Sequence, residues 1–439
     1  MTIGSGDHRR GNPEGLPKKS PCALLWDQSF LWGVMARQAL AEAGLSFDLL
    51  RAEEIRAGGL DRYRLLFVPG GWASNKIGAL GSRGLDEIRG FVQRGGNYLG
   101  ICGGAGMATQ DGLGLLPVSR KPGPKRVPSF SGAIRISTEH PLLLQGIERP
   151  VFHAWWPSQF QIADCGVRVI ATYQEAQAGA FSADIPIEAG RDEGWAALEE
   201  RYGILLDPDR LIGEPAVVEG RFGRGRVLLS LLHFDTPGDR NGAAVLKNIW
   251  DDLAPGSPAV RADAGDLSCR VLPDLPQTLW ECLGTIEKAA ADWCAAGERN
   301  FLWHWRTPYL LQWRRGVRGL ECSILVAMIA EIRRRLERCG PEGSGRRPGL
   351  SGPPDPNRLL EELEAIRCAT VQFVEKAKRL LIRELFYMQT APLSPLNCND
   401  PDIRRLRGEL FGIGMSHGGE FKFLLDALDG FLWELAGEI

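Results

Sequence analysis

Residues 97–106, with the sequence NYLGICGGAG, join a short apolar run to a cysteine that has small residues close on both sides. An apolar run of this length is typical of a buried strand, and the Gly-rich segment after it is typical of a tight turn into a helix. A strand–turn–helix unit with a nucleophile at its tip is a nucleophile elbow, in which neighbouring glycines relieve crowding around a strained residue. The pattern from Gly100 to Gly104 is G-x-C-x-G, which makes Cys102 a candidate nucleophile.

The composition is that of an ordinary globular chain of 439 residues, long enough for two or three domains. The formal net charge is −2, so no basic surface for nucleic acid is predicted. No uncharged apolar run reaches the roughly 18 residues of a membrane span, and the N-terminus lacks the apolar core of a signal peptide. Ten cysteines without a CxxC pair, and only six histidines, argue against a disulfide framework and a zinc cluster. We therefore expect a cytoplasmic protein with no metal, no cofactor, and no nucleic-acid or membrane partner.

Residues 21–253 show strands and helices in alternation, which predicts an α/β domain built on a doubly wound, mostly parallel sheet. The expected elements of its first part are strand 22–26, helix 31–43, strand 46–50, strand 64–68, helix 85–93, and the strand and helix around Cys102. Ligands of such sheets bind outside the carboxyl ends of the strands, where both Gly70-Gly71 and Cys102 fall.

The second part of this domain is turn-rich and β-like from about residue 117. It contains a basic loop, SRKPGPKRVPSF (119–130), and an aromatic stretch, VFHAWWPSQF (151–160). We interpret residues 1–20 as a disordered leader and residues 254–275 as a linker rich in Pro, Gly and Ala. The further expected elements are strands 167–173, 215–219 and 226–232, followed by a closing helix, 242–253.

Residues 276–439 have helical apolar spacing, which predicts an all-α bundle domain of four or five helices. A Gly/Pro-rich stretch at 339–356 is expected to be a mobile loop. Six of the thirteen tryptophans fall in this domain. Because Trp and Arg anchor interfaces, the domain is a candidate for self-association or for binding a protein partner, although packing against the α/β domain explains the same residues. The expected helices are 276–297, 318–338, 358–389, 400–413 and 418–436.

Cysteine chemistry needs a thiolate, a base, and hydrogen-bond donors for the developing oxyanion. At the start of a helix, the macrodipole and free N–H groups favour the anion of Cys102. The candidate base is His233, at the end of a late strand, and Asp235 points the same way because it lies two residues further along an extended segment. The turn at Gly70 and Gly71, together with Gly103, can offer backbone N–H groups as an oxyanion hole.

Two further groups of residues are candidates for substrate binding. Trp72, His153, Trp156 and Gln159 could line a pocket near the thiol, although aromatic clusters of this kind also form ordinary core packing. The basic loop supplies four cations that could receive a carboxylate or a phosphate, or could simply be solvated: Arg120, Lys121, Lys125 and Arg126.

Three segments resemble the class I glutamine amidotransferase-like fold and, more narrowly, the domain at the N-terminus of eukaryotic-type biotin-protein ligases, which also occurs in bacterial proteins. They are FVPGGWASNK (67–76), FVQRGGNYLGICGGAG (91–106) and GRGRVLLSLLHFD (223–235). The resemblance covers about residues 21–253. It implies a flavodoxin-like sheet with Cys102 as the nucleophile, His233 as the base, and Asp235 at the position of the family's glutamate.

The chain departs from the glutaminases of this class at two places. They usually carry Gln four residues after the cysteine, where this chain has Gly106, and they usually read His-Pro-Glu, where this chain has His233-Phe234-Asp235. A standard glutaminase is therefore not predicted.

Three hypotheses about function remain open from the sequence. The first is an amidotransferase-like protein whose Cys102, His233 and Asp235 perform thioester-type acyl transfer or hydrolysis on a small amide or ester. The second is a non-catalytic protein that binds a small molecule or acts as a scaffold, with the helical domain as its interaction module. The third is a redox or glyoxalase-type activity at the same cysteine, which would need an acidic residue near the thiol.

Overall fold

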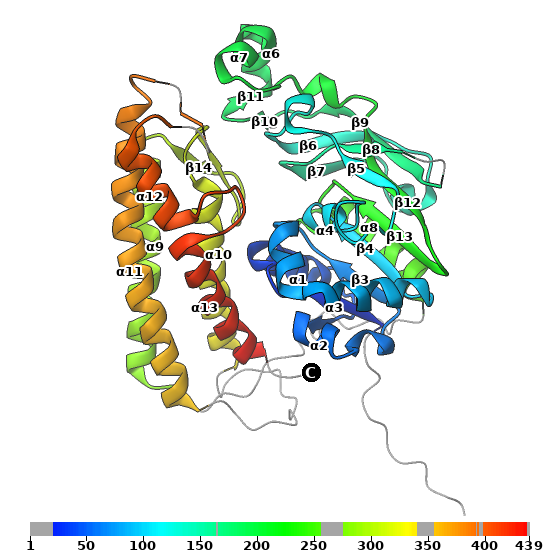
Figure 1. The fold of residues 1–439 in the computed structure, drawn as a ribbon, viewed down its shortest axis with the longest axis horizontal. Coiled ribbons are helices and arrows are strands. Elements are labelled where there is room, and N and C mark those ends of the chain that lie inside the picture. Colours follow the sequence, from blue (N-terminus) through cyan, green and yellow to red (C-terminus); the bar gives the residue numbers. More distant parts are fainter. Residues whose placement is uncertain are drawn as a thin grey trace, which may run out of the picture.

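The computed structural model describes residues 21–163, 166–255, 275–339, 355–391, 393–394 and 398–436. The predicted leader, most of the predicted linker and most of the predicted loop at 339–356 lie outside these ranges. An α/β part and a helical part lie side by side (Figure 1). No helix of the described residues is long and apolar enough to cross a membrane.

The centre of the α/β part is a run of five parallel strands in the spatial order β2, β1, β3, β4, β13. Their side chains are almost all buried, which explains why each strand reads as a continuous apolar run. The strands are β1 (Cys22–Leu25), β2 (Asp48–Leu50), β3 (Leu65–Val68), β4 (Asn97–Ile101) and β13 (Gly225–Ser230).

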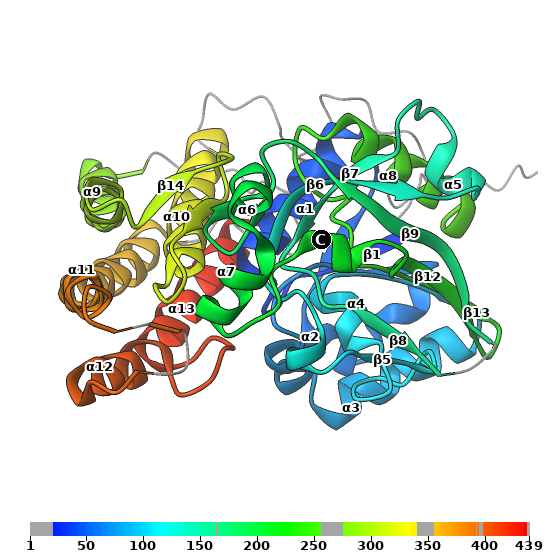
Figure 2. The ribbon, with the colours of Figure 1, turned by 90° about the horizontal axis from the view of Figure 1, so that it is seen from above.

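Helices cover both faces of these parallel strands. Helices α1 (Phe30–Glu42) and α8 (Arg240–Leu253) lie on one face, and α2 (Ala52–Arg56) and α3 (Ala73–Gln93) lie on the other, as Figure 2 shows. Helix α3 begins twelve residues before the expected position and has a break at Gly81, where φ is 60°. The predicted doubly wound α/β class is confirmed.

Antiparallel strands extend the sheet beyond β13 to a total of eleven strands. The turn-rich region of the sequence supplies most of them, and their half-buried alternation is typical of a sheet with one face partly exposed. The additional strands are β12 (Pro215–Phe222), β9 (Arg168–Ala176), β6 (Phe130–Ser137), β7 (Val151–Trp155), β10 (Phe181–Ser182) and β11 (Ile185–Pro186). A separate pair, β5 (Val118–Arg120) and β8 (Phe160–Ile162), lies beside the sheet.

The helical part contains five long helices where the sequence spacing predicts them. They are α9 (Gln277–Arg299), α10 (Gly319–Cys339), α11 (Pro356–Tyr387), α12 (Pro401–Phe411) and α13 (Gly419–Ala436). A β-hairpin of β14 (Trp303–Trp305) and β15 (Leu311–Trp313) also lies here, contrary to the expectation that the strand pattern ends before residue 276. Strands of three residues are too short to show an alternating pattern, so the sequence gives no signal for this hairpin.

The two parts share one hydrophobic core and a buried polar contact. Helix α1 packs against α10, where Arg37 forms an ion pair with the fully buried Glu331. Arg334 and Arg335 of α10 also pair with that carboxylate. A buried carboxylate is tolerated when several cations compensate for its lost hydration. The helical part therefore contacts the α/β part through buried apolar side chains and a buried ion pair.

Candidate functional site

Cys102 lies at the tip of the turn between β4 and the short helix α4 (Gly103–Met107). Its φ of 50° and ψ of −102° are strained for a residue with a side chain. The glycines after it are required by close backbone contacts. A Cβ atom on Gly103 would lie 1.7 Å from the Gly71 carbonyl oxygen, and one on Gly104 would lie 1.9 Å from the Val68 carbonyl oxygen.

The half-buried Cys102 receives little help from helix α4, which has only five residues. A macrodipole requires several aligned peptide units, so the helix-start effect expected from the sequence is small here. Charged side chains around the thiol therefore matter more than the helix itself.

His233 and Asp235 form a fully buried pair in which His233 Nδ1 lies 2.9 Å from Asp235 Oδ1. His233 Nε2 is buried and makes no hydrogen bond to any nitrogen or oxygen of the described residues. Burial alone would lower the pKa of the imidazole, but Asp235 and the nearby Cys102 outweigh it and raise the pKa of His233 to about 10. The ring also stacks on Trp32 at a centroid distance of 4.7 Å. The imidazolium form is thus favoured at neutral pH.

The glycines predicted to form an oxyanion hole lie together beside these residues. A Cβ atom on Gly70 would lie 3.1 Å from His233 Cε1, so the backbone at Gly70 borders the imidazole ring. Gly71 has a φ of 104° and contacts Gly103 closely. The structure brings together Gly70, Gly71, Gly103 and His233, all around the Cys102 tip.

Lys76 is a residue near the thiol that sequence reasoning missed. It is fully buried in the first turn of α3, and its Nζ donates hydrogen bonds to the Gln28 carbonyl oxygen, at 3.2 Å, and to Ser29 Oγ. Burial lowers the pKa of Lys76 to about 7, opposed by Asp27, Asp429 and Cys102, which favour its charged form. Its position within FVPGGWASNK was visible in the sequence, but helical lysines are usually exposed.

Backbone strain is concentrated around this site. Six described residues other than glycine have positive φ, and four of them surround the site: Gln28 and Phe30 after β1, Cys102, and Trp156. Each such residue costs roughly 1–3 kcal/mol and persists only where the surroundings hold it. Strain of this kind clusters at functional sites.

The four predicted pocket residues occupy different environments. Trp156 packs against Trp32, the neighbour of His233, and Trp72 borders the turn that follows β3. The His153 side chain pairs with the Asp239 carboxylate, with its Nδ1 2.9 Å from Asp239 Oδ2. Gln159 is buried and its Oε1 accepts a hydrogen bond of 2.8 Å from the backbone of Val127, so it supports a loop.

The helical part supplies two aromatic side chains to this region. The buried His417 ring contacts Phe30 and Trp72 at centroid distances of 5.7 and 6.3 Å, and the Asn75 side chain donates to the His417 carbonyl oxygen. Burial and nearby cations lower the pKa of His417 to about 3, so it is neutral. Trp313 of the hairpin packs on Trp156.

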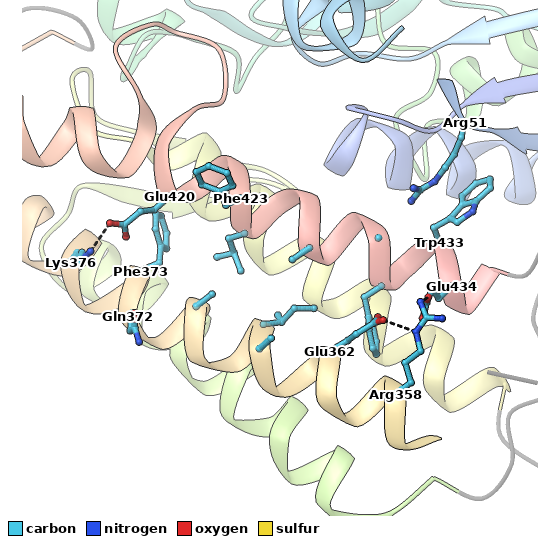
Figure 3. Close-up of a pocket in the computed structure, with 17 residues that line it drawn as sticks. Arg51, Arg358, Glu362, Gln372, Phe373, Lys376, Glu420, Phe423, Trp433 and Glu434 are labelled. Carbon is cyan, nitrogen blue, oxygen red and sulfur yellow. Dashed lines mark hydrogen bonds and ion pairs between the residues drawn. The ribbon is translucent and has the colours of Figure 1, made fainter. Parts of the chain in front are cut away.

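A separate groove of about 790 Å³ lies between α11 and α13, as Figure 3 shows. Ion pairs stand at its two ends, Lys376 with Glu420 and Arg358 with Glu434. Among the described residues, those that line the groove include none of the residues around Cys102.

Residues 60–111 match the protein family described as "Biotin-protein ligase, N terminal". This segment contains Gly70, Gly71, Lys76 and Cys102. The resemblance expected from the sequence is therefore confirmed over this segment. No curated protein matches the chain.

Several solved structures align with roughly half of the chain. PurLQS from Thermotoga maritima is 18% identical, with 53% of this chain and 99% of that chain covered and a TM-score of 0.37. A candidate GMP synthase protein from Thermoplasma acidophilum is 13% identical, with coverages of 54% and 94% and a TM-score of 0.34. A β-galactosidase from Rahnella sp. R3 is 13% identical, with coverages of 54% and 32% and a TM-score of 0.34.

Proposed function

We propose, from the resemblance of residues 60–111 to the biotin-protein ligase N-terminal family, that residues 21–253 form a cysteine-dependent acyl-transfer or hydrolase domain. Its substrate would be a small amide or ester, and its intermediate a thioester at Cys102. The observation that carries this proposal is the buried pair of His233 and Asp235 beside a thiol held in a strained turn.

The reaction follows from the charges of the three side chains. The thiol proton of Cys102 passes to His233, and the thiolate sulfur forms a bond to the substrate carbonyl carbon while the electron pair of the carbonyl moves to its oxygen, next to Gly71 and Gly103. When the carbonyl re-forms, the C–N or C–O bond breaks and His233 gives its proton to the leaving group. Water or another acceptor then attacks the thioester, its proton returns to His233, and the thiolate is released. Asp235 stabilises the imidazolium before His233 gives up its proton and again after the proton returns.

Gly106 and Asp235 distinguish this site from a glutaminase site. Gly106 lacks the side chain that glutaminases of the class place four residues after the cysteine, and Asp235 is shorter than their glutamate. We therefore place glutamine outside the proposed substrate range.

Alkylation of the native protein with iodoacetamide, followed by peptide mass spectrometry, tests the proposal. The exposed Cys368 is a reference thiol in the same chain. We expect Cys102 to react faster than Cys368 although it is less exposed, and the His233→Asn variant to lose about tenfold or more of that rate, because general acid–base partners contribute 10²–10⁴-fold to catalysis. The Cys368→Ser variant should leave the rate at Cys102 unchanged. Equal rates at the two thiols would refute the proposed chemistry.

A second candidate function is a small-molecule-binding or scaffold protein that lacks catalysis. It is favoured by Gly106 and by the contacts of His417 and Trp313, through which the helical part borders the site. Ligand binding that is unchanged in Cys102→Ala, together with an unreactive Cys102 in the wild type, would support it.

A further inference from the structure

We infer that Arg120 and Arg126 form a subsite for an anionic substituent of the substrate, separate from the oxyanion hole. Cys102 would then act on a small amide or ester that carries a carboxylate or a phosphate. This inference rests on the proposed function. It assigns a role to two cations of the basic loop that neither the elbow nor the buried pair requires.

The first argument is the position of Arg120 next to the elbow. Gly106 lies one helical turn after Cys102, and its N–H donates to the Cys102 carbonyl oxygen at 2.9 Å. A Cβ atom on Gly106 would lie 3.7 Å from Arg120 Nη1 and 3.8 Å from Arg120 Cδ. The Arg120 side chain therefore lies beside the space that a longer residue at position 106 would occupy. Four residues of an α-helix rise about 6 Å along its axis, so a small substrate bound at Cys102 would extend toward this position.

The second argument is the uncompensated charge of Arg126. Its Nε is buried without a hydrogen-bond partner in the described part of the chain. Burial, and repulsion by the Arg120 guanidinium, lower the pKa of Arg126. The neighbouring Lys121, in contrast, pairs with Glu214 at 2.6 Å. Arg120 is exposed and Arg126 is half-buried, and no ion pair to either is found among the described residues. A bound anion would compensate the charge of the half-buried Arg126.

The third argument is the rigidity of the loop that carries the two arginines. The buried Gln159 holds it at both ends: its carbonyl oxygen accepts from the Lys121 N–H, and its side-chain Oε1 accepts from the Val127 N–H, both at 2.8 Å. Arg120 is also the last residue of β5, paired with Phe160 of β8. The backbone that carries the two arginines is therefore held in place, and each guanidinium group can donate two parallel hydrogen bonds to a carboxylate or phosphate.

Binding measurements test the subsite without using the thiol. We would titrate the Cys102→Ala protein with succinamate, its neutral counterpart succinamide, and inorganic phosphate by calorimetry. We expect succinamate or phosphate to bind and succinamide to bind about tenfold or more weakly, because each charge-assisted hydrogen bond is worth that factor or more. Tighter binding of succinamate would indicate a substrate with a carboxylate, and tighter binding of phosphate a substrate with a phosphate group. The additional changes Arg120→Gln and Arg126→Gln should each weaken anion binding about tenfold, and Lys125→Gln, which removes an exposed charge of the same loop, should not.

Alkylation separates failure of the subsite from failure of the proposed function. Iodoacetate and iodoacetamide both form a C–S bond with loss of iodide, but only iodoacetate is anionic. We expect the rate with iodoacetate divided by the rate with iodoacetamide to be about tenfold higher at Cys102 than at Cys368. In the double variant Arg120→Gln/Arg126→Gln, this ratio at Cys102 should fall to the value at Cys368. Anion binding that requires the arginines, with an inert Cys102, would keep the subsite and refute the chemistry. Equal anion affinity with and without the arginines, or no anion binding at all, would overturn the inference.

Discussion

A buried lysine next to a thiol has a charge that depends on pH within the physiological range. Lys76 is fully buried, and burial holds its pKa at about 7, so its ammonium form exists mainly below that pH. Only the ammonium form attracts the Cys102 thiolate. Asp27, Asp429 and Cys102 face Lys76 and favour that form, whereas Gln28 and Ser29 bind it by hydrogen bonds.

The Lys76→Met variant should lower the alkylation rate of Cys102 several-fold at pH 6 and leave it nearly unchanged at pH 8.5. The sign follows from the lowered pKa: the wild-type side chain carries the charge at pH 6 and has lost it at pH 8.5. Mass spectrometry of samples quenched at set times, at the two pH values, measures the effect. Lys247→Met, on the exposed face of α8, is the control. The same loss of rate at both pH values would show that Lys76 acts through packing.

The residues of the candidate site differ in how visible they are from the sequence. Cys102 and His233 stand at strand ends, and short-range geometry aligns Asp235 with His233, so local patterns suffice to single them out. Arg120 is marked by the basic loop in which it lies, although its position beside Gly106 depends on tertiary contacts. Lys76 reaches the site through tertiary contacts alone. A lysine in a helix is exposed in most proteins, so nothing local marks it.

The elbow is the element in which backbone contacts leave least room. Gly103→Ala would place a methyl group 1.7 Å from the Gly71 carbonyl oxygen, so the turn and the β3 loop would have to separate. We expect a loss of unfolding free energy of about 3 kcal/mol or more, because overpacking against a backbone cannot be relieved by a rotamer change.

Gly78→Ala in α3 is the matched control, since a Cβ atom there would have nothing within 4 Å. It should stabilise the protein by about 0.5–1 kcal/mol through helix propensity. Urea denaturation measures both variants. An elbow that tolerates alanine would show that Gly71 and Gly103 are less closely apposed than described above.

The sequence predicts those elements whose apolar residues form a continuous run or repeat at helical spacing. The continuous apolar runs of the parallel strands and the apolar stripes of the five long helices are local signals, and their observed bounds differ from the expected ones by a few residues. The first half of α3 is polar and glycine-rich, so its early start was missed. The β14–β15 hairpin was missed because its strands have three residues each.

At the scale of the whole molecule, Glu331 joins the helical part to the α/β part. Its carboxylate is fully buried and compensated by Arg37, Arg334 and Arg335, which together lower the pKa of Glu331 against the effect of burial. Neutralising it would leave several guanidinium groups facing one another without that anion.

The Glu331→Gln variant should lose about 3–5 kcal/mol of unfolding free energy, the cost of breaking a buried ion pair by removing one partner. Denaturation followed by circular dichroism and tryptophan fluorescence measures it. Glu337→Gln, in an exposed pair with Arg333 on the same helix, should change the value by less than about 1 kcal/mol. If the two Gln variants were equally stable, the buried pair would not join the two parts.

The stacking of Trp32 on the His233 ring places an indole directly against the candidate base. Tryptophan emission is sensitive to a charge placed against the indole ring. Because the pKa of His233 is raised to about 10, the indole of Trp32 faces an imidazolium at neutral pH and a neutral ring only in alkaline solution. Acylation of Cys102, or arrival of an anion nearby, would change that balance of charge. Trp32, one of thirteen tryptophans, is therefore placed to report the protonation state of the candidate base, as the difference in emission between the wild type and Trp32→Phe.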